Sequence, residues 1–143
     1  MFMGKHNHTI DPKGRLSIPS KFREVLGEEF VISKGMDGCL FVYPMDEWTE
    51  FYNKLKSLNQ LDDNSRQFVR YFLHGADTVT VDKQGRILMP QHLIEAAGLE
   101  KDVVVAGAGT RVEIWDTKKY DKQSKGVDID KVSKAMLNLG FSI

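Results

Sequence analysis

Hydrophobic positions come in short runs separated by turn-forming residues, a pattern typical of short strands and short helices. The first part of the chain predicts, in order, a strand ending at 9–10, a strand through 16–18, a helix opened by Pro19 and stopped by Gly27, and strands at 30–33 and 39–43. Within the helix, Phe22, Val25 and Leu26 fall at helical spacing and are expected to face the core.

The same order of elements returns in the second half. It predicts strands at 79–81 and 87–89, a helix opened by Pro90 and stopped by Gly98, and strands at 103–106 and 111–115. Here Leu93, Ala96 and Ala97 occupy the expected core face of the helix. Gly107, Gly109 and the residues around them fit a hairpin turn between the last two strands, since no phosphate-loop motif is present.

Longer helical periodicity is confined to the middle and the end of the chain. The middle carries an amphipathic stripe formed by Trp48, Phe51, Tyr52, Leu55 and Leu58. A second helix is expected after a cap at Asn64 or Ser65, with Phe68, Val69, Phe72 and Leu73 as its apolar residues and Gly75 as its end. Near the C-terminus, Val132, Met136 and Leu139 predict one more helix.

The two β-rich parts are copies of one sequence unit. Residues 9–27, TIDPKGRLSIPSKFREVLG, align without gaps on residues 80–98, TVDKQGRILMPQHLIEAAG. The identical pairs are Thr9/Thr80, Asp11/Asp82, Gly14/Gly85, Arg15/Arg86, Pro19/Pro90, Glu24/Glu95 and Gly27/Gly98. So many matches of Gly, Pro, Asp and Arg in so short a span indicate duplication.

Neither copy has enough apolar surface to fold alone, so the two are expected to pack on each other in one α+β fold. We divide the chain into a first repeat at 5–47, a helical connector at 48–75, a second repeat at 76–119 and a C-terminal helical tail at 120–143. The chain of 143 residues is 41% hydrophobic, which is enough to bury a core.

Charge is balanced overall but segregated along the chain. Twenty basic residues offset twenty acidic ones. Residues 5–24 nevertheless hold five basic side chains against two acidic ones, and residues 46–63 hold the reverse. One face of a neutral protein can therefore be basic, as binding to a polyanion requires.

The repeated motif Asp-x-x-Gly-Arg carries the candidate chemistry. Asp and Gly suit a tight turn, which leaves Arg15 and Arg86 projecting just beyond it. The planar guanidinium of arginine matches guanine O6 and N7, and the preceding Asp can orient it through a charge-assisted pair. A salt bridge that merely closes the turn is the alternative. The candidate DNA-binding residues are Asp11, Lys13, Gly14, Arg15, Asp82, Lys83, Gly85 and Arg86, with the two lysines as phosphate contacts.

Other chemistry has weak support in the sequence. His6 and His8 share one face of a strand, but no third ligand follows at metal-like spacing, so no metal or cofactor is expected. Cys39 is the single cysteine, and we expect it to be a buried small hydrophobic residue in a reducing cytoplasm. No paired acid and base constellation indicates an enzyme. No apolar run is long enough for a membrane span, and the first residues lack the pattern of a signal peptide.

Three separated segments together resemble the MraZ family of bacterial regulators: MFMG…HTIDPKGRLSIPSKFR, QFVRYFLHGA and VDKQGRILMP. The resemblance implies two SpoVT/AbrB-type domains in an intramolecular pseudo-dimer, and a ring-shaped homo-oligomer associated with the nucleoid. It also implies binding to double-stranded DNA at tandem G-rich repeats ahead of a division and cell-wall gene cluster that includes the protein's own gene. The family's DNA-contacting motif corresponds to Asp11 with Arg15 and Asp82 with Arg86.

A different class of function remains open at this point, namely an AbrB-like antitoxin or protein-interaction module. Such a protein is expected to have one copy of the module and a long, disordered, acidic tail. This chain has two copies and a tail with helical periodicity, which favours the DNA-binding interpretation.

Overall fold

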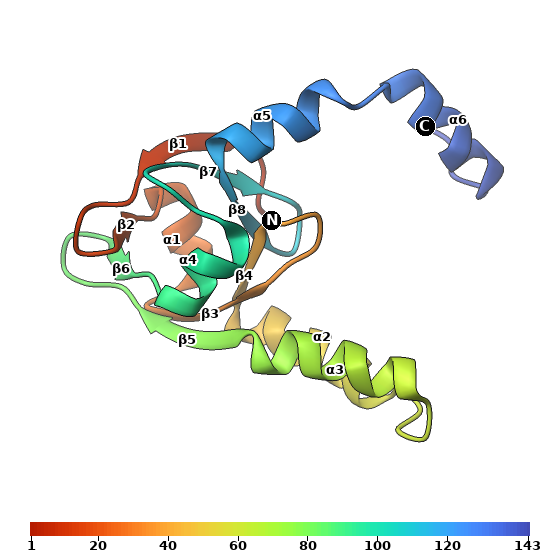
Figure 1. Cartoon of the computed structure of the whole chain (residues 1–143), viewed down its shortest axis with the longest axis horizontal. Coiled ribbons are helices and arrows are strands. Elements are labelled where there is room, and N and C mark those ends of the chain that lie inside the picture. The colour runs from red at the N-terminus through yellow and green to blue at the C-terminus, as the bar shows by residue number, and fades with distance from the viewer.

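Eight β-strands and six α-helices make up the computed structural model, which describes residues 1–143 (Figure 1). The strands are β1 (Lys5–Thr9), β2 (Arg15–Ser17), β3 (Glu29–Lys34), β4 (Leu40–Pro44), β5 (Ala76–Thr80), β6 (Arg86–Leu88), β7 (Asp102–Gly107) and β8 (Val112–Asp116). The helices are α1 (Ser20–Leu26), α2 (Met45–Lys56), α3 (Asp63–His74), α4 (Gln91–Ala97), α5 (Thr117–Lys125) and α6 (Ile129–Asn138). The α+β class and the two repeated β units are confirmed.

The two repeats exchange strands. In the larger sheet the order is β1-β7-β8-β4-β3-β5, with every neighbouring pair antiparallel. The first strand of each repeat therefore pairs with the third strand of the other, β1 with β7 and β5 with β3. Strands β2 and β6 form a separate two-stranded ribbon, again one from each repeat. This exchange confirms that the repeats fold as a pseudo-dimer, because each completes the sheet of the other.

Alternation along the central strands divides the buried residues between two cores. On β4, Leu40 and Val42 point into the main core, while Phe41 and Tyr43 point to the opposite face of the sheet. The main core lies under α1, α4 and the β2–β6 ribbon, and it contains twenty buried residues. The second core is an aromatic cluster that α2 and α3 cover through Leu55 and Phe72. Burial on both faces explains why β4 reads as a continuous apolar run.

The short helices begin and end as the sequence indicates. Pro19 and Pro90 stand immediately before α1 and α4, and Gly98 ends α4 in the left-handed conformation, with φ 59°. The expected inward face was wrong at Val25 and Ala96, which are exposed. Each helix has only seven residues and touches the core along one line, so one i, i+4 pair fills that contact: Phe22 with Leu26, and Leu93 with Ala97.

The connector helices also differ from expectation in detail. The cap of α3 is Asp62, whose carboxylate accepts a hydrogen bond from the Ser65 backbone N–H at 3.1 Å, so the prediction of Asn64 or Ser65 was wrong. An Asp two or three residues earlier serves equally well as an acceptor, and sequence alone does not distinguish among these neighbouring polar residues. Tyr52 and Leu58 of the predicted stripe are exposed at the outer edge of α2 and just beyond it.

The tail contains two helices where one was expected. Helix α5 packs on β7 and β8, and α6 then leads away from the sheets (Figure 1). The predicted apolar residues Val132 and Met136 are on α6 and are exposed. No helix has both the length and the apolar character that crossing a membrane would need.

Candidate nucleic-acid interface

The β2–β6 ribbon displays one polar face to solvent at the end of the molecule opposite α6. Its register pairs Arg15 with Leu88, Leu16 with Ile87, and Ser17 with Arg86. Leu16 and Ile87 are fully buried, so the other two cross-strand pairs point outward together. Both motif arginines therefore lie on a single exposed face, in diagonal positions.

The first turn is organised by the Asp11 carboxylate. One oxygen, Oδ1, accepts the backbone N–H groups of Lys13 at 3.0 Å and of Arg15 at 2.8 Å. The other, Oδ2, accepts the Arg15 Nε–H at 2.6 Å in an ion pair. Gly14 closes the turn by donating to the Asp11 carbonyl with φ 82°, a conformation that favours glycine. Arg15 is thereby held through one edge, and its two terminal nitrogens remain free of protein partners.

The second turn repeats this geometry. Asp82 Oδ1 accepts the backbone N–H groups of Gln84 and Arg86, each at 2.9 Å, and Oδ2 accepts the Arg86 Nε–H at 3.1 Å. Gly85 closes the turn with φ 77°. A further hydrogen bond joins Arg86 Nη2 to the Gln84 side-chain oxygen. The predicted orientation of each arginine by the Asp four residues earlier is thus present in both repeats.

These contacts also favour the ionised form of both aspartates. The backbone N–H of Arg15 is the main cause that lowers the pKa of Asp11, and the Arg15 guanidinium adds to it. The pKa of Asp82 is lowered in the same way, first by the backbone N–H of Arg86. Near neutral pH each carboxylate is therefore charged, and each arginine stays paired and positioned before any ligand arrives.

Each turn is fixed in place by the opposite repeat. The Ile18 N–H donates to the Gly85 carbonyl at 3.0 Å, and the Met89 N–H donates to the Gly14 carbonyl at 2.9 Å. On the second turn only, the Arg23 side chain from α1 lies against Gly85, and its Nε–H donates to the Ile18 carbonyl at 2.9 Å. Because a Cβ at Gly85 would be 2.5 Å from Arg23 Nη1, this approach needs glycine.

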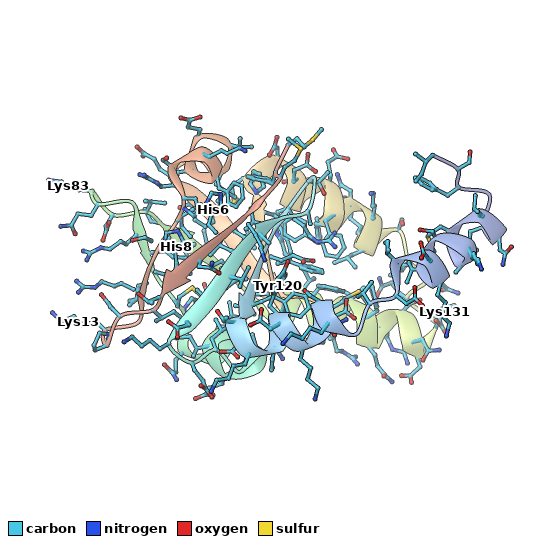
Figure 2. All side chains as sticks on the ribbon, turned by 90° about the horizontal axis from the view of Figure 1, so that it is seen from above. His6, His8, Lys13, Lys83, Tyr120 and Lys131 are labelled. Atoms are coloured by element: carbon cyan, nitrogen blue, oxygen red, sulfur yellow. The ribbon has the colours of Figure 1, made fainter.

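Lys13 and Lys83 extend from the tips of the two turns, away from the rest of the molecule (Figure 2). Both are exposed, and neither forms a salt bridge. Arg23 also lacks an acidic partner, although sequence reasoning did not include it among the candidate residues. Its position in the basic segment 5–24 was the one available signal. With both aspartates already paired to arginines, the positive charges of Lys13, Lys83 and Arg23 are left without acidic partners.

Comparison with known proteins gives the same duplicated organisation. The model of the MraZ protein family, described as antitoxin-like, matches twice, over residues 1–71 and 72–138. The chain belongs to the MraZ family. A relative in Acetivibrio thermocellus is 51% identical over 99% of this chain and 100% of its own length. Others are 48% identical in Clostridium acetobutylicum, over 99% and 100%, and 56% identical in Heliobacterium modesticaldum, over 87% of each chain. All three carry the name transcriptional regulator MraZ.

The remaining candidates lie away from the two turns of this MraZ-family chain. His6 packs edge-to-face on Phe22 with ring centroids 5.2 Å apart, while burial, followed by the nearby His6, lowers the pKa of His8. No three His, Cys, Asp or Glu side chains gather as a metal would require. Cys39 is 3% exposed, and burial raises the pKa of its thiol to about 12, so the expectation of a buried apolar residue is confirmed.

Proposed function

We propose that this protein is a sequence-specific, DNA-binding transcriptional regulator whose β2–β6 ribbon reads the major groove. The observation that carries the proposal is the pair of outward arginines on one two-stranded ribbon, each held by an aspartate through its Nε edge. A two-stranded ribbon fits the major groove, and a guanidinium presents the donor pair that guanine O6 and N7 accept. The name transcriptional regulator, shared by the relatives above, supports the same conclusion. We propose no catalytic activity.

Charge around the ribbon fits the phosphate backbone. Lys13 and Lys83 lie apart at the tips of the two turns, where they could meet the phosphates on either side of a groove (Figure 2). We assign them to phosphate contacts, with Arg23 as a third, because their ammonium and guanidinium groups have no acidic partner in the chain. The turn glycines, Gly14 and Gly85, belong to the proposed site because their positive φ shapes the turns that carry the arginines.

The resemblance to MraZ regulators supports a specific target, tandem G-rich repeats ahead of the division and cell-wall gene cluster that includes the protein's own gene. One pseudo-dimer reads only a few bases, so its affinity for a single short site is expected to be low. Several identical modules at fixed spacing would gain on the order of 10²–10⁴ in avidity without any new contact. We therefore propose a ring-shaped homo-oligomer that acts on the nucleoid in the cytoplasm.

An unpartnered apolar face supports self-association. Ile129, Val132, Met136 and Leu137 on α6, followed by Phe141, are exposed at the end of the molecule away from the turns. Their place leaves the ribbon free for DNA when neighbouring copies pack on α6. Light scattering on a sizing column checks this proposal: a monomer at micromolar concentration would contradict it.

A gel shift with the DNA upstream of the protein's own gene tests the function directly. We expect wild-type protein to shift this DNA, and the Arg15→Ala/Arg86→Ala variant to lose the specific shift. Each arginine is solvent-facing, so its removal opens no core cavity and should preserve the circular dichroism spectrum and the melting temperature. The matched control is Arg66→Ala/Arg70→Ala on α3, which removes two arginines from a surface remote from the ribbon and should bind normally. Normal binding by a well-folded ribbon variant would overturn the proposal.

The phase of the repeats tests the avidity mechanism separately. Modules on one side of a rigid ring meet the same face of the duplex every ~10–10.5 bp. Inserting ~5 bp between two repeats should lower the affinity to that of a single repeat, and inserting a full turn should restore part of it. Indifference to both insertions would mean that each module binds alone.

A further inference from the structure

Leu88 is an apolar side chain on an otherwise polar face. It is 65% exposed, and it is the only exposed large apolar residue within any of the eight strands. Its cross-strand partner is Arg15, so the leucine and the arginine stand side by side on the outward face of the ribbon. Single exposed leucines are common on protein surfaces, and exposure alone would need no explanation. Its position beside Arg15, on a face that is otherwise polar, does need an explanation.

The fold does not require an apolar residue here. Leu88 aligns in the repeat with Ser17, which occupies the same outward position on β2 and pairs with Arg86. The two strands keep the same backbone register and the same buried neighbour, Leu16 or Ile87. A serine therefore satisfies this position in one repeat. The leucine in the other has its Cδ1 near Gly14 of the first turn, but the residue remains 65% exposed, so most of its apolar surface is left for a ligand. A ligand that covers the ribbon would explain the difference.

Base edges in the major groove offer one apolar group, the C5 methyl of thymine. Directly opposed residues of an antiparallel pair have Cβ atoms about 4.5–5.5 Å apart, a separation comparable to the ~3.4 Å step between neighbouring bases on a strand. A side chain beside a guanine-reading arginine can therefore reach the adjacent base pair. Serine in the equivalent place donates to or accepts from any base and selects none strongly.

We infer that Leu88 is a specificity-determining residue that contacts the thymine methyl group of the base pair adjacent to the guanine read by Arg15. The inference rests on the proposed DNA-binding function. It makes the two halves of the pseudo-dimer unequal readers: the Arg15–Leu88 pair selects a guanine next to a thymine, whereas the Arg86–Ser17 pair selects a guanine with little preference beside it.

Replacing thymine with deoxyuridine tests this contact at the level of one methyl group. The probe is a duplex that carries the proposed G-rich repeat from upstream of the protein's own gene, with each thymine beside a guanine replaced singly. For the wild type, one such replacement should weaken binding roughly four-fold, because burying one methylene-sized group is worth about 0.8 kcal/mol. Leu88→Ala should bind the unmodified duplex more weakly, and it should not distinguish thymine from uracil at that position.

The matched control is Leu61→Ala, the same change at an exposed leucine in the loop between α2 and α3. It should keep both the affinity and the four-fold sensitivity of the wild type. Wild-type protein that binds the duplex without sensing any methyl group, or Leu88→Ala protein that keeps the sensitivity, would overturn the role of Leu88 and leave the DNA-binding function standing. Absence of any wild-type shift would overturn the proposed function as well. A change of oligomeric state in Leu88→Ala would make Leu88 an interface residue and also overturn the inference.

Discussion

The two Asp-x-x-Gly-Arg turns have the same backbone and different surroundings. Both use an aspartate to accept two backbone N–H groups and the Nε–H of an arginine. In the first turn the positions between Asp and Gly are Pro12 and Lys13, whereas in the second they are Lys83 and Gln84. The Gln84 side chain holds Arg86, and Lys13 leaves Arg15 without this second contact.

The supports beneath the turns differ as well. Arg23 of α1 lies against Gly85 of the second turn. Its counterpart in the repeat, Ile94 of α4, lies near the first turn and brings no charge. Duplication thus preserved the hydrogen bonds that shape the turns, while the side chains that would meet a ligand diverged. Two turns of the same shape that carry different side chains would suit a DNA site without two-fold symmetry.

The single arginine variants are the strongest test of the shared geometry. We expect Arg15→Ala and Arg86→Ala each to lower specific DNA affinity by roughly five- to 150-fold, because one bidentate guanine contact is worth about 1–3 kcal/mol. The two losses should be of similar size, since each arginine is held by an equivalent aspartate. Titration by fluorescence anisotropy at fixed salt checks this. If one variant binds as the wild type does, only one of the two turns reads DNA.

Alanine in place of the turn glycines separates the two supports. Both glycines have positive φ, so Gly14→Ala and Gly85→Ala should each cost about 1–2 kcal/mol of unfolding free energy. Gly85→Ala must also displace Arg23 from its hydrogen bond with the Ile18 carbonyl, which adds about 1 kcal/mol. Denaturant unfolding monitored by circular dichroism measures the difference.

The variant Arg23→Ala provides the control for that comparison. With the guanidinium removed, a Cβ at Gly85 no longer meets it, and the extra cost of Gly85→Ala should disappear. An equal penalty at Gly14 and Gly85 in the wild-type background would mean that Arg23 moves aside without cost.

The shape of the turns could be predicted from the sequence, because it depends on local chemistry. Asp and Gly at fixed spacing and an Arg just beyond them specify a turn within five residues, and their repetition at two places removed most of the ambiguity. The contact between Arg23 and Gly85 joins residues more than sixty positions apart. Periodicity and turn chemistry carry no information about such a contact, which follows only from the exchange of strands between repeats.

The helices show the same difference between what local sequence predicts and what depends on distant contacts. Helical spacing predicted α6, since Val132 and Met136 are four residues apart and so lie on one face of a helix. It also predicted an apolar face without saying what covers it. Val25 and Ala96 were assigned to the core for the related reason that spacing identifies a face of a helix, while the width of the buried stripe depends on the neighbours packed against it.

Salt dependence tests the difference between Lys13 and Gln84. A lysine that contacts phosphate releases counterions, so Lys13→Gln should reduce the slope of log K against log salt concentration by about one per bound module. The reciprocal change, Gln84→Lys, should increase the slope by a similar amount and also free Arg86 from its glutamine partner. The effect of Lys13→Gln should be uniform across DNA sequences, because phosphates carry no sequence information. Gln84→Lys should in addition change the preference at the base that Arg86 reads. Glu50→Gln on α2 serves as a charge-changing control away from the ribbon.

Acidification should produce the smallest effect, and it acts on the part that the two turns share. The pKa of Asp11 and that of Asp82 are both lowered from the ordinary value of 3.8, chiefly by the backbone N–H groups of Arg15 and Arg86. A carboxyl whose pKa is lower in the folded state stabilises the fold above its unfolded pKa, and this contribution is lost as the pH falls through the folded value. Stability should therefore be insensitive to these groups between pH 7 and about 5, and should decline below about pH 4.

Asp11→Asn keeps an oxygen that accepts the backbone hydrogen bonds but removes the charge. The wild type should therefore exceed this variant in unfolding free energy at pH 6 and lose its advantage by about pH 2. Denaturant titrations across this range measure the difference, with Asp82→Asn as the equivalent change in the second repeat. An advantage that persists undiminished at the lowest pH would show that the carboxylate charge does not stabilise the turn, and that the hydrogen bonds alone hold Arg15 in place.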